Sequence, residues 1–210
     1  EAMNIRSTIL RHFEDLSRFE DEVININVIG GGPTGVEMAG AIKRLLDGAH
    51  WTDAKRSFML GDASTRAYER LEKTDGQKAI LMISPPRPDG PPVRYGKPYS
   101  AIARLAENIL PFIAIDEGLR NRGFSAPEIY AYDAKAGLAI LEDLGQAGII
   151  DQSGPIEERY AEASAALAHL HKLDLPAKID LADGSSYQIP VYDMDALLIE
   201  VELLTQWYVP

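Results

Sequence analysis

The chain has 210 residues, of which 46% are hydrophobic, with a formal net charge of -11 and a pI near 4.8. This length fits one domain of ordinary size or two small ones, with enough apolar residues for a packed core. The negative charge repels phosphate backbones and anionic lipid, so we do not expect nucleic acid as a partner.

Other compositional features exclude several kinds of protein. The sequence contains no cysteine, which excludes disulfide bonds, a thiolate nucleophile and a cysteine-ligated zinc site. No apolar run approaches the roughly 20 residues that a membrane-spanning helix needs. The opening EAMNIRSTIL lacks the apolar core of a signal peptide. We therefore expect a cytoplasmic protein that is not embedded in a membrane.

The first predicted elements are a helix, a strand, a glycine turn and a second helix. Apolar residues recur at helical spacing over 5–16, and the apolar run at 23–29 indicates a strand. The segment VIGGGPTGVEMAG follows at 28–40, and a helical pattern continues from it. Its G-x-G-x-x-G spacing is formed by Gly30, Gly32 and Gly35.

A strand, a glycine turn and a helix are the context of a dinucleotide-binding fingerprint. The glycines let the backbone approach a pyrophosphate, and the helix N-terminus offers unpaired N–H groups and partial positive charge. The fingerprint also needs a second parallel strand that ends in an acid about 20 residues on. Asp62 is the candidate acid, although it lies further along the chain. The alternative is a glycine turn that joins strand to helix without a ligand.

Three strand-like runs follow and predict an antiparallel meander. They are SFMLGD at 57–62, AYERLE at 67–72 and KAILMIS at 78–84, and the turn TDG at 74–76 separates the last two. Six prolines between 85 and 98 exclude regular structure, so we expect a surface loop there.

The rest of the chain alternates between helical and strand-like patterns. A helix is predicted from Tyr99, interrupted at Pro111 and ending near Gly123. We expect the whole segment 57–145 to fold as one sheet with a helix packed on it. The remaining predicted elements are a hairpin with strands at 128–133 and 137–143 and helices at 155–173 and 193–208.

The glycine segment resembles part of one enzyme family. GGGPTGVEMAGAI, with the upstream IRSTILRHFEDL, is similar to the nicotinamide-binding segment of type II NADH dehydrogenases and related flavoprotein oxidoreductases. The resemblance covers residues 4–42 and lacks the flavin-binding fingerprint of that family. It implies NADH as a ligand of the three glycines, in a fragment of an NAD(P)H/FAD-dependent oxidoreductase.

Four later blocks, in order, resemble the aminoglycoside phosphotransferase superfamily. They are FMLGDASTRAYERLEKTDGQKAILMISPP, GFSAPEIYAYDAKAGLAILEDLG, ALAHLHKLDLP and IPVYDMDALLIEVELLTQWYVP. The likeness is closest to the N-acetylmuramate/N-acetylglucosamine anomeric kinases. It extends to the kinase-like half that is fused in some proteins to the ATPase subunit of the tRNA threonylcarbamoyladenosine system. The resemblance implies transfer of phosphate from ATP, with Mg²⁺, to a small hydroxylated substrate, expected to be a sugar.

The fold class that this resemblance implies is α+β. Residues 45–145 would form a protein-kinase-like N-lobe, which is an antiparallel sheet with a helix. Residues 146–210 would form the first helices of a C-lobe. The strand, glycine turn and helix at 1–44 would be a separate segment that precedes the lobe.

The resemblance also implies a nucleotide site. A turn of small polar residues between two strands lays backbone donors over phosphates, and GDAST at 61–65 is such a turn. Arg66 would bind phosphate oxygens bidentately, or is a solvated surface arginine. The backbone from Glu142 to Leu144 would be the hinge that reads the adenine edge, or is an ordinary strand end. The predicted nucleotide-binding residues are Asp62, Ser64, Thr65, Arg66, Lys78, Glu142 and Leu144.

Some positions depart from the family pattern. Kinases hold the phosphates with a lysine inside the third strand, whereas Lys78 lies at the start of KAILMIS. The anomeric kinases tend to have an acid after the Leu-Met pair, where this chain has Ile83. No H-x-D-x-x-x-x-N-like run occurs, so we name no catalytic or metal-binding residue. We expect a kinase truncated before its catalytic loop, or a fusion; a third hypothesis is a non-catalytic binding fragment.

Overall fold

The computed structural model describes residues 33–60, 66–87 and 90–207. The chain divides into two units, residues 1–36 and residues 37–210. In the first unit only the beginning of helix α2 (Pro33–Gly48) is described. The helix and strand predicted at 5–16 and 23–29 therefore lie outside the described residues.

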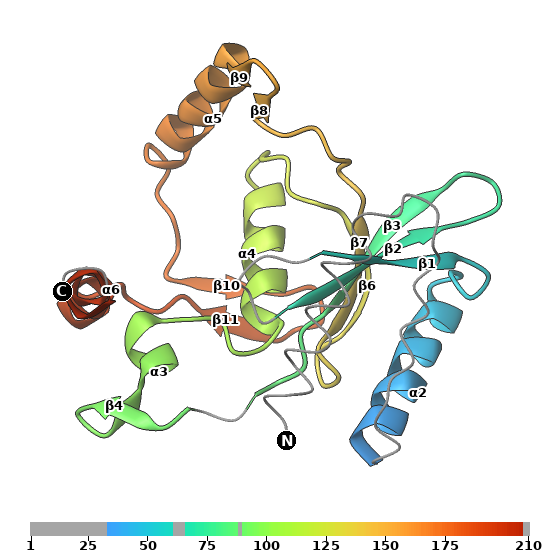
Figure 1. The fold of residues 1–210 in the computed structure, drawn as a ribbon, viewed down its shortest axis with the longest axis horizontal. Coiled ribbons are helices and arrows are strands. Elements are labelled where there is room, and N and C mark those ends of the chain that lie inside the picture. The colour runs from blue at the N-terminus through green and yellow to red at the C-terminus, as the bar shows by residue number, and fades with distance from the viewer. Residues whose placement is uncertain (1–32, 61–65, 88–89, 208–210) are drawn as a thin grey trace. The chain divides into compact units, whose positions relative to one another are not determined.

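Five strands form one antiparallel sheet in the order β1-β2-β3-β7-β6 (Figure 1). The predicted meander and the predicted hairpin join because β3 and β7 are neighbours, with Ala79 opposite Glu142 and Ile83 opposite Leu138. The prediction that the meander and the hairpin of 57–145 form one sheet is thus confirmed, although the same segment also contains a separate two-stranded sheet. The strands are β1 (Lys55–Met59), β2 (Ala67–Glu72), β3 (Lys78–Ile83), β6 (Ile129–Asp133) and β7 (Leu138–Glu142).

The two central strands of this sheet are buried on both faces. Their sequences, KAILMI and LAILE, are continuous apolar runs, which is typical of strands covered on both sides. Ala79 and Leu81 of β3 belong to one buried cluster, while Met82 belongs to another. Alternate side chains therefore face two separate layers of the lobe.

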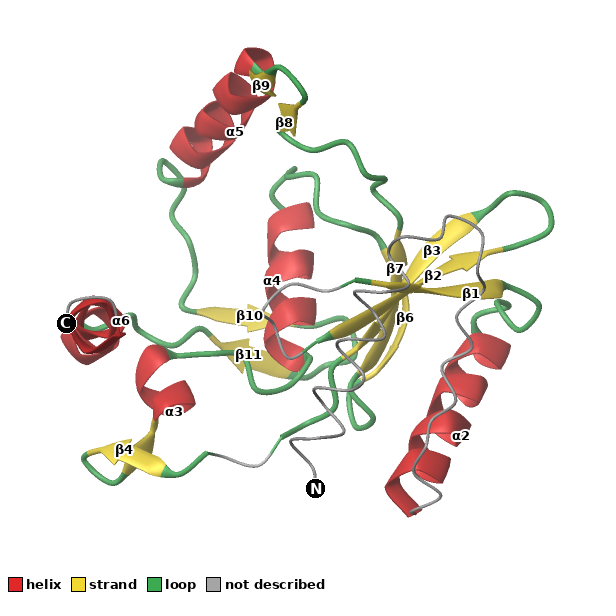
Figure 2. Ribbon diagram, viewed as in Figure 1, coloured by secondary structure: helices red, strands yellow, loops and turns green. Residues whose placement is uncertain are grey.

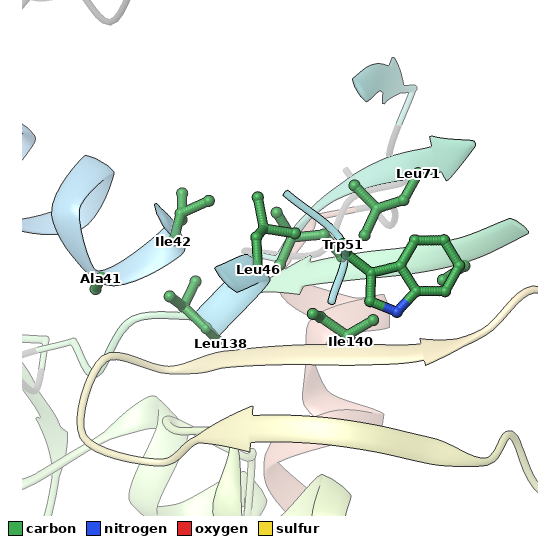
Figure 3. Close-up of a cluster of buried hydrophobic side chains, with 9 residues drawn as sticks. Ala41, Ile42, Leu46, Trp51, Leu71, Leu138 and Ile140 are labelled. Atoms are coloured by element: carbon green, nitrogen blue, oxygen red, sulfur yellow. The ribbon is translucent and has the colours of Figure 1, made fainter. Parts of the chain in front are cut away.

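The C-terminal part of α2 packs on the first face. Its Ala41, Ile42 and Leu46 form one buried cluster with strand residues such as Leu138 (Figure 3). Trp51, just after the helix, belongs to this cluster and stacks on the ring of Tyr130. Since full burial of an aliphatic side chain stabilises a fold by about 1.5–3 kcal/mol, this helix contributes substantially to the lobe.

Helix α4 (Leu110–Arg120) packs on the second face, as Figure 2 shows in red beside the yellow strands. Its fully buried Ile113 and Ala114 contact the cluster that contains Met82 and Leu141. The hairpin of β10 (Lys178–Asp180) and β11 (Ser186–Gln188) contacts α4 as well, and Ile179 of β10 joins the same cluster. The helix is thus enclosed between the sheet and this hairpin.

The predicted break at Pro111 lies earlier in the structure. Helix α3 (Tyr99–Ala103) ends at Arg104, which has a left-handed φ of 59°. Helix α4 then begins at Leu110 with Pro111 in its first turn. Proline is favoured in a first turn because its missing N–H would have no helical partner there. Pro111 therefore helps to start the second helix and does not interrupt a longer one.

The proline-rich segment contains regular structure, which corrects the prediction of a plain loop at 85–98. β4 (Pro92–Arg94) and β5 (Lys97–Pro98) form a small antiparallel hairpin. Its turn residues Tyr95 and Gly96 both have positive φ. The two prolines lie at strand ends, where a missing N–H costs little.

The C-terminal segment contains two helices and short strand pairs. The helices predicted at 155–173 and 193–208 are present as α5 (Glu157–Leu170) and α6 (Met194–Trp207), and β8 (Ile150–Asp151) with β9 (Gly154–Pro155) precedes α5. An α+β fold is confirmed, since a five-stranded antiparallel sheet with a packed helix matches the predicted kinase-like N-lobe. None of the described helices has the length and apolar character needed to cross a membrane.

Gly137 is expected to be the least replaceable residue of the β6–β7 turn. It has a φ of 71°, and a Cβ there would lie 2.1 Å from the carbonyl oxygen of Ser84. The N–H of Ser84 donates to the carbonyl of Gly137 at 2.7 Å, so the two backbones are in direct contact. Because backbone atoms cannot rotate away, Gly137→Ala should lower the free energy of unfolding by about 3 kcal/mol or more, measured by urea denaturation.

Gly76 provides a matched control. It also has a positive φ, 88°, but nothing lies within 4 Å of an added Cβ. Gly76→Ala should therefore lower the free energy of unfolding only by the cost of a left-handed backbone at alanine, about 1–2 kcal/mol. Equal losses in the two variants would contradict the close contact at Gly137.

Candidate functional site

The face of the sheet that α4 covers is the candidate site. Directly opposed residues of an antiparallel pair project from the same face. Tyr68 of β2 lies opposite Met82, and Arg70 lies opposite Ile80. Because Met82 packs against α4, these β2 side chains project from the α4 face as well.

The strand registers define two ends of this face. At one end, Glu72 is opposite Lys78, and Ala79 is opposite Glu142 at the end of β7. This hinge end adjoins residues 142–145. At the other end, Ala67 is opposite Ile83, so Arg66 and the predicted phosphate turn at 61–65 adjoin it in the chain. Five residue steps along β3 separate the two ends, about 17 Å.

Lys78 lies at the hinge end. Its Nζ is 3.6 Å from a carboxylate oxygen of Glu72, and both side chains are about half exposed. Along β3, Lys78 is about 17 Å from the end that adjoins the phosphate turn. The structure therefore does not bring Lys78 together with Arg66.

An ion pair holds the hinge segment to β2. The Nε and Nη2 of Arg70 lie 2.7 and 3.4 Å from the two carboxylate oxygens of Asp143. The Asp143 side chain is 6% exposed and that of Arg70 is 21% exposed. Asp143 also accepts the N–H of Gly145, which has a left-handed φ of 83°. These contacts fix the turn that follows β7.

The charge state of Asp143 follows from these contacts. Burial by itself raises the pKa of its carboxyl. The hydrogen bonds from Arg70 and Gly145, with the positive charges of Arg70 and Lys78, act in the opposite direction and hold the pKa below its ordinary value. The pair is therefore charged on both sides at neutral pH.

The two predicted hinge residues differ in their surroundings. The backbone N–H of Glu142 donates to the carbonyl of Glu128 at 2.8 Å, and its carboxylate accepts the N–H of Glu128 at 3.0 Å. Leu144 has a side chain that is 60% exposed. The N–H of Glu142 is thus used inside the sheet, so an adenine edge would meet the residues that follow it.

Arg66 lies at the other end of the face. Its guanidinium carbon is 5.6 Å from the ring centroid of Phe112 on α4. The other predicted phosphate ligands, Asp62, Ser64 and Thr65, lie outside the described residues. The structure therefore places one member of the predicted phosphate site, against helix α4.

A pocket of about 330 Å³ lies where Arg66 meets α4. Asp116 is 4% exposed, and neither carboxylate oxygen has a hydrogen-bond partner among the described residues. Burial raises the pKa of Asp116; the charge of Arg120 opposes this rise and that of Glu117 adds to it. The pocket is lined by Arg66, Ala106, Pro111, Phe112, Ile115, Asp116, Leu119, Ala126 and Pro127.

The sequence analysis missed Asp116. The signal that was present is an acid within the apolar stretch LPFIAID, four residues after Phe112 and so on the same side of the helix. The sequence does not show whether such an acid is buried or solvated, and only the burial of Asp116 in the structure distinguishes the two cases. Within the described ranges, no group of three or more His, Asp or Glu side chains is arranged to hold a metal ion.

The glycine turn is only partly described. Gly30 and Gly32 lie outside the described residues, and Gly35 lies near the beginning of α2. From Ala41 onward this helix packs on an antiparallel sheet, whereas a dinucleotide-binding domain packs the helix on a parallel one. This part of α2 thus contributes to the antiparallel lobe.

Residues 56–202 match the model of the phosphotransferase enzyme family. The N-acetylmuramate/N-acetylglucosamine kinase of Caulobacter vibrioides is 37% identical over 167 residues, which are 74% of this chain and 46% of that protein. The protein of the same name from Pseudomonas putida is 30% identical over 150 residues, 70% of this chain and 36% of that protein. The chain thus spans less than half the length of these two relatives.

A third similarity concerns another class of enzyme. The type II NADH:quinone oxidoreductase Ndh of Mycobacterium tuberculosis is 36% identical over 94 residues, which are 40% of this chain and 20% of that protein. This share is too small to show membership of that family.

Replacement of Arg70 by Met tests the hinge pair. The variant leaves the Asp143 carboxylate buried without its partner, so its free energy of unfolding should fall by about 2 kcal/mol at pH 7. The folded pKa of Asp143 lies below the unfolded value of about 3.9. The contribution of the pair is therefore fully present above about pH 4 and is lost as the pH falls through the folded pKa. Urea denaturation between pH 7 and pH 2.5 measures both effects.

The control is Arg56→Met. Arg56 pairs with Glu69 at 2.6 Å, with side chains that are 41% and 19% exposed. A more exposed pair of this kind contributes about 0–1 kcal/mol. The same loss in both variants, or a loss in Arg70→Met that does not change with pH, would contradict the role of the hinge pair.

Proposed function

The chain belongs to the phosphotransferase enzyme family, and from this membership we propose that it is the nucleotide-binding part of an ATP-dependent kinase. The acceptor is a small hydroxylated substrate, in the first place an N-acetylated amino sugar such as N-acetylmuramate or N-acetylglucosamine. The proposal is supported above all by the antiparallel lobe with α4 packed on one face, within residues 56–202 that match the family. The kinases of Caulobacter vibrioides and Pseudomonas putida suggest the sugar.

We place the nucleotide on the α4 face of the sheet. In kinases a cation of the third strand and an acid of the packed helix meet at the phosphates, so the nucleotide lies on the face that carries this helix. An extended ATP has its base and its triphosphate at opposite ends. On this face the hinge residues lie at one end, and Arg66, which follows the phosphate turn in the chain, lies at the other, about 17 Å apart along β3.

Each predicted site residue then has a proposed place. Leu144 would contact adenine through its backbone, Glu142 would lie beside it at the strand end, and Lys78 would lie near the base end. Arg66 would contact the phosphates with its guanidinium, which can bind two phosphate oxygens at once. Asp62, Ser64 and Thr65 belong to the turn that would cover the phosphates with backbone N–H groups.

Catalysis would need groups from a second lobe. Phosphoryl transfer requires Mg²⁺ held by acidic and amide side chains and a carboxylate beside the attacking hydroxyl. No H-x-D-x-x-x-x-N-like run occurs in these 210 residues. We therefore propose that they bind nucleotide without transferring its phosphate.

In the proposed organisation the N-terminal segment is 1–44, the N-lobe is 45–145 and the beginning of the C-lobe is 146–210, with α2 spanning the first boundary.

A second candidate function is binding of NADH at the glycine turn. It is favoured by the 94 residues that are 36% identical to the Mycobacterium tuberculosis oxidoreductase. Tight NADH binding without any response to ATP would favour this function. Binding of neither ligand would favour a non-catalytic fragment.

Calorimetry with Mg-ATP tests the nucleotide site. We expect a Kd in the micromolar range or weaker, because the metal ligands of a second lobe are not among the predicted contacts. Arg66→Ala should weaken ATP binding about tenfold through the loss of a charge-assisted contact to phosphate.

Lys78→Ala serves as the comparison variant. Since Lys78 lies at the hinge end beside Glu72, any effect of this change should be the same for ATP and for adenosine. Submicromolar ATP affinity, or an Arg66→Ala variant that binds ATP as the wild type does, would contradict the proposed site.

A transfer assay with radiolabelled γ-phosphate tests the proposal about catalysis. The acceptors are N-acetylmuramate, N-acetylglucosamine and an aminoglycoside, and we expect no turnover by the 210-residue chain. The control is the double variant Asp62→Ala, Arg66→Ala. Turnover that persists in it would indicate a contaminating kinase, whereas turnover that it abolishes would show that the chain is a complete enzyme.

A further inference from the structure

Asp116 is a buried acid without a partner among the described residues. It is 4% exposed, and both carboxylate oxygens lack a hydrogen bond. Leaving a buried carboxylate unpaired is strongly unfavourable unless it is neutralised or acquires a donor. A group of this kind in a pocket is therefore a candidate for a functional role.

Arg66 is positioned to supply that donor. Its guanidinium carbon lies 5.6 Å from the ring centroid of Phe112. Phe112 and Asp116 are four residues apart in α4, so they lie on one side of the helix with their Cβ atoms about 6 Å apart. Arg66 and Asp116 also line the same pocket. Rotation about the side-chain bonds of Arg66 would have to move its guanidinium from Phe112 along α4 by about one helical turn, roughly 5 Å. Its N–H groups would then reach the carboxylate of Asp116.

The other charged groups near Asp116 are less suited to this role. Arg120 acts on the pKa of Asp116 through its charge, but it lies one turn beyond Asp116 in α4, in the direction away from Phe112, where its Nη1 donates to the carbonyl of Ala126 at 2.8 Å. Glu117 has the same sign of charge as Asp116, and its carboxylate accepts the N–H of Ala182 beside β10. Arg66 approaches from the start of β2, at the end of the sheet where the phosphates are proposed to lie.

Strand β3 supplies no cation at that end. The α4 face of β3 is formed there by Ile80 and Met82, and Lys78 is at the hinge end. Kinases use a third-strand lysine for the phosphates and position it with an acid of the packed helix. We propose that Arg66 and Asp116 replace that pair: Asp116 is a positioning residue whose carboxylate holds the Arg66 guanidinium against the phosphates of a bound nucleotide.

The chemistry of arginine allows this double contact. A guanidinium has five N–H donors in a planar fork, so it can donate to a carboxylate and to phosphate oxygens at the same time. Lysine is a point charge and lacks this geometry. The inference rests on the proposed function, because it requires that a nucleotide with phosphates binds on the α4 face.

The test compares ADP with adenosine. Mg-ADP and adenosine are titrated calorimetrically into the 210-residue chain and into its Asp116→Asn variant, which keeps the size of the side chain and removes the charge. We expect the affinity for ADP to fall about tenfold and that for adenosine to stay unchanged, because the contact concerns the phosphates alone. Unchanged ADP affinity, or an equal loss for both ligands, would overturn the inference.

A double-mutant cycle identifies the partner. If Asp116 acts through Arg66, the variant with both Arg66→Ala and Asp116→Asn should bind ADP no more weakly than Arg66→Ala alone. Glu117→Gln removes the neighbouring acid of α4 and should leave ADP binding unchanged. Additive losses in the double variant would overturn the pairing.

Failure of the proposed function has a different signature. A wild-type chain that binds neither ADP nor adenosine would overturn both the nucleotide site and the role of Asp116. Equal ADP affinities of the wild-type chain and the Asp116→Asn variant would overturn the role of Asp116 alone. The Tm of each variant is measured alongside, and Asp116→Asn should not lower it, since a buried unpaired charge is removed.

Discussion

The pairing of β3 with β7 is the contact on which the rest of the lobe depends. It joins a meander and a hairpin that are separated in sequence by two helices, and it brings the residues after β7 beside the beginning of β3. Both strands are buried on two faces, so the pairing also creates the surfaces on which α2 and α4 pack. Without this ladder there would be neither a hinge end nor a helix-covered face.

The two faces of the sheet have different chemical characters. The α2 face is closed by aliphatic side chains and by Trp51, and it contributes mainly packing energy. The α4 face carries an ion pair at its hinge end, Arg70 with Asp143, and the Arg66 and Asp116 pocket at its other end. Charged groups under an apolar sheet are costly, and here they lie at the two ends of one face.

The family match covers the antiparallel lobe, and the third strand of this lobe departs from the usual kinase pattern. A lysine within the third strand is the ordinary phosphate anchor, and this chain has apolar residues there. An arginine at the start of the second strand with an acid on the packed helix offers the same two charges from other positions. Different residues can thus supply one electrostatic arrangement on the same fold.

The sequence alone was sufficient to locate the five strands of the main sheet, most helices and the phosphotransferase resemblance, but not the short pairs β8–β9 and β10–β11. Local apolar patterns and turn residues are enough to predict the strands KAILMIS and GLAILED and the turn TDG, because these elements depend on residues close together in the sequence. It did not show the hairpin within the proline-rich segment. The distance between Lys78 and Arg66, and the burial of Asp116, were decided only by tertiary structure, because strand register and helix burial depend on contacts between residues far apart in the sequence.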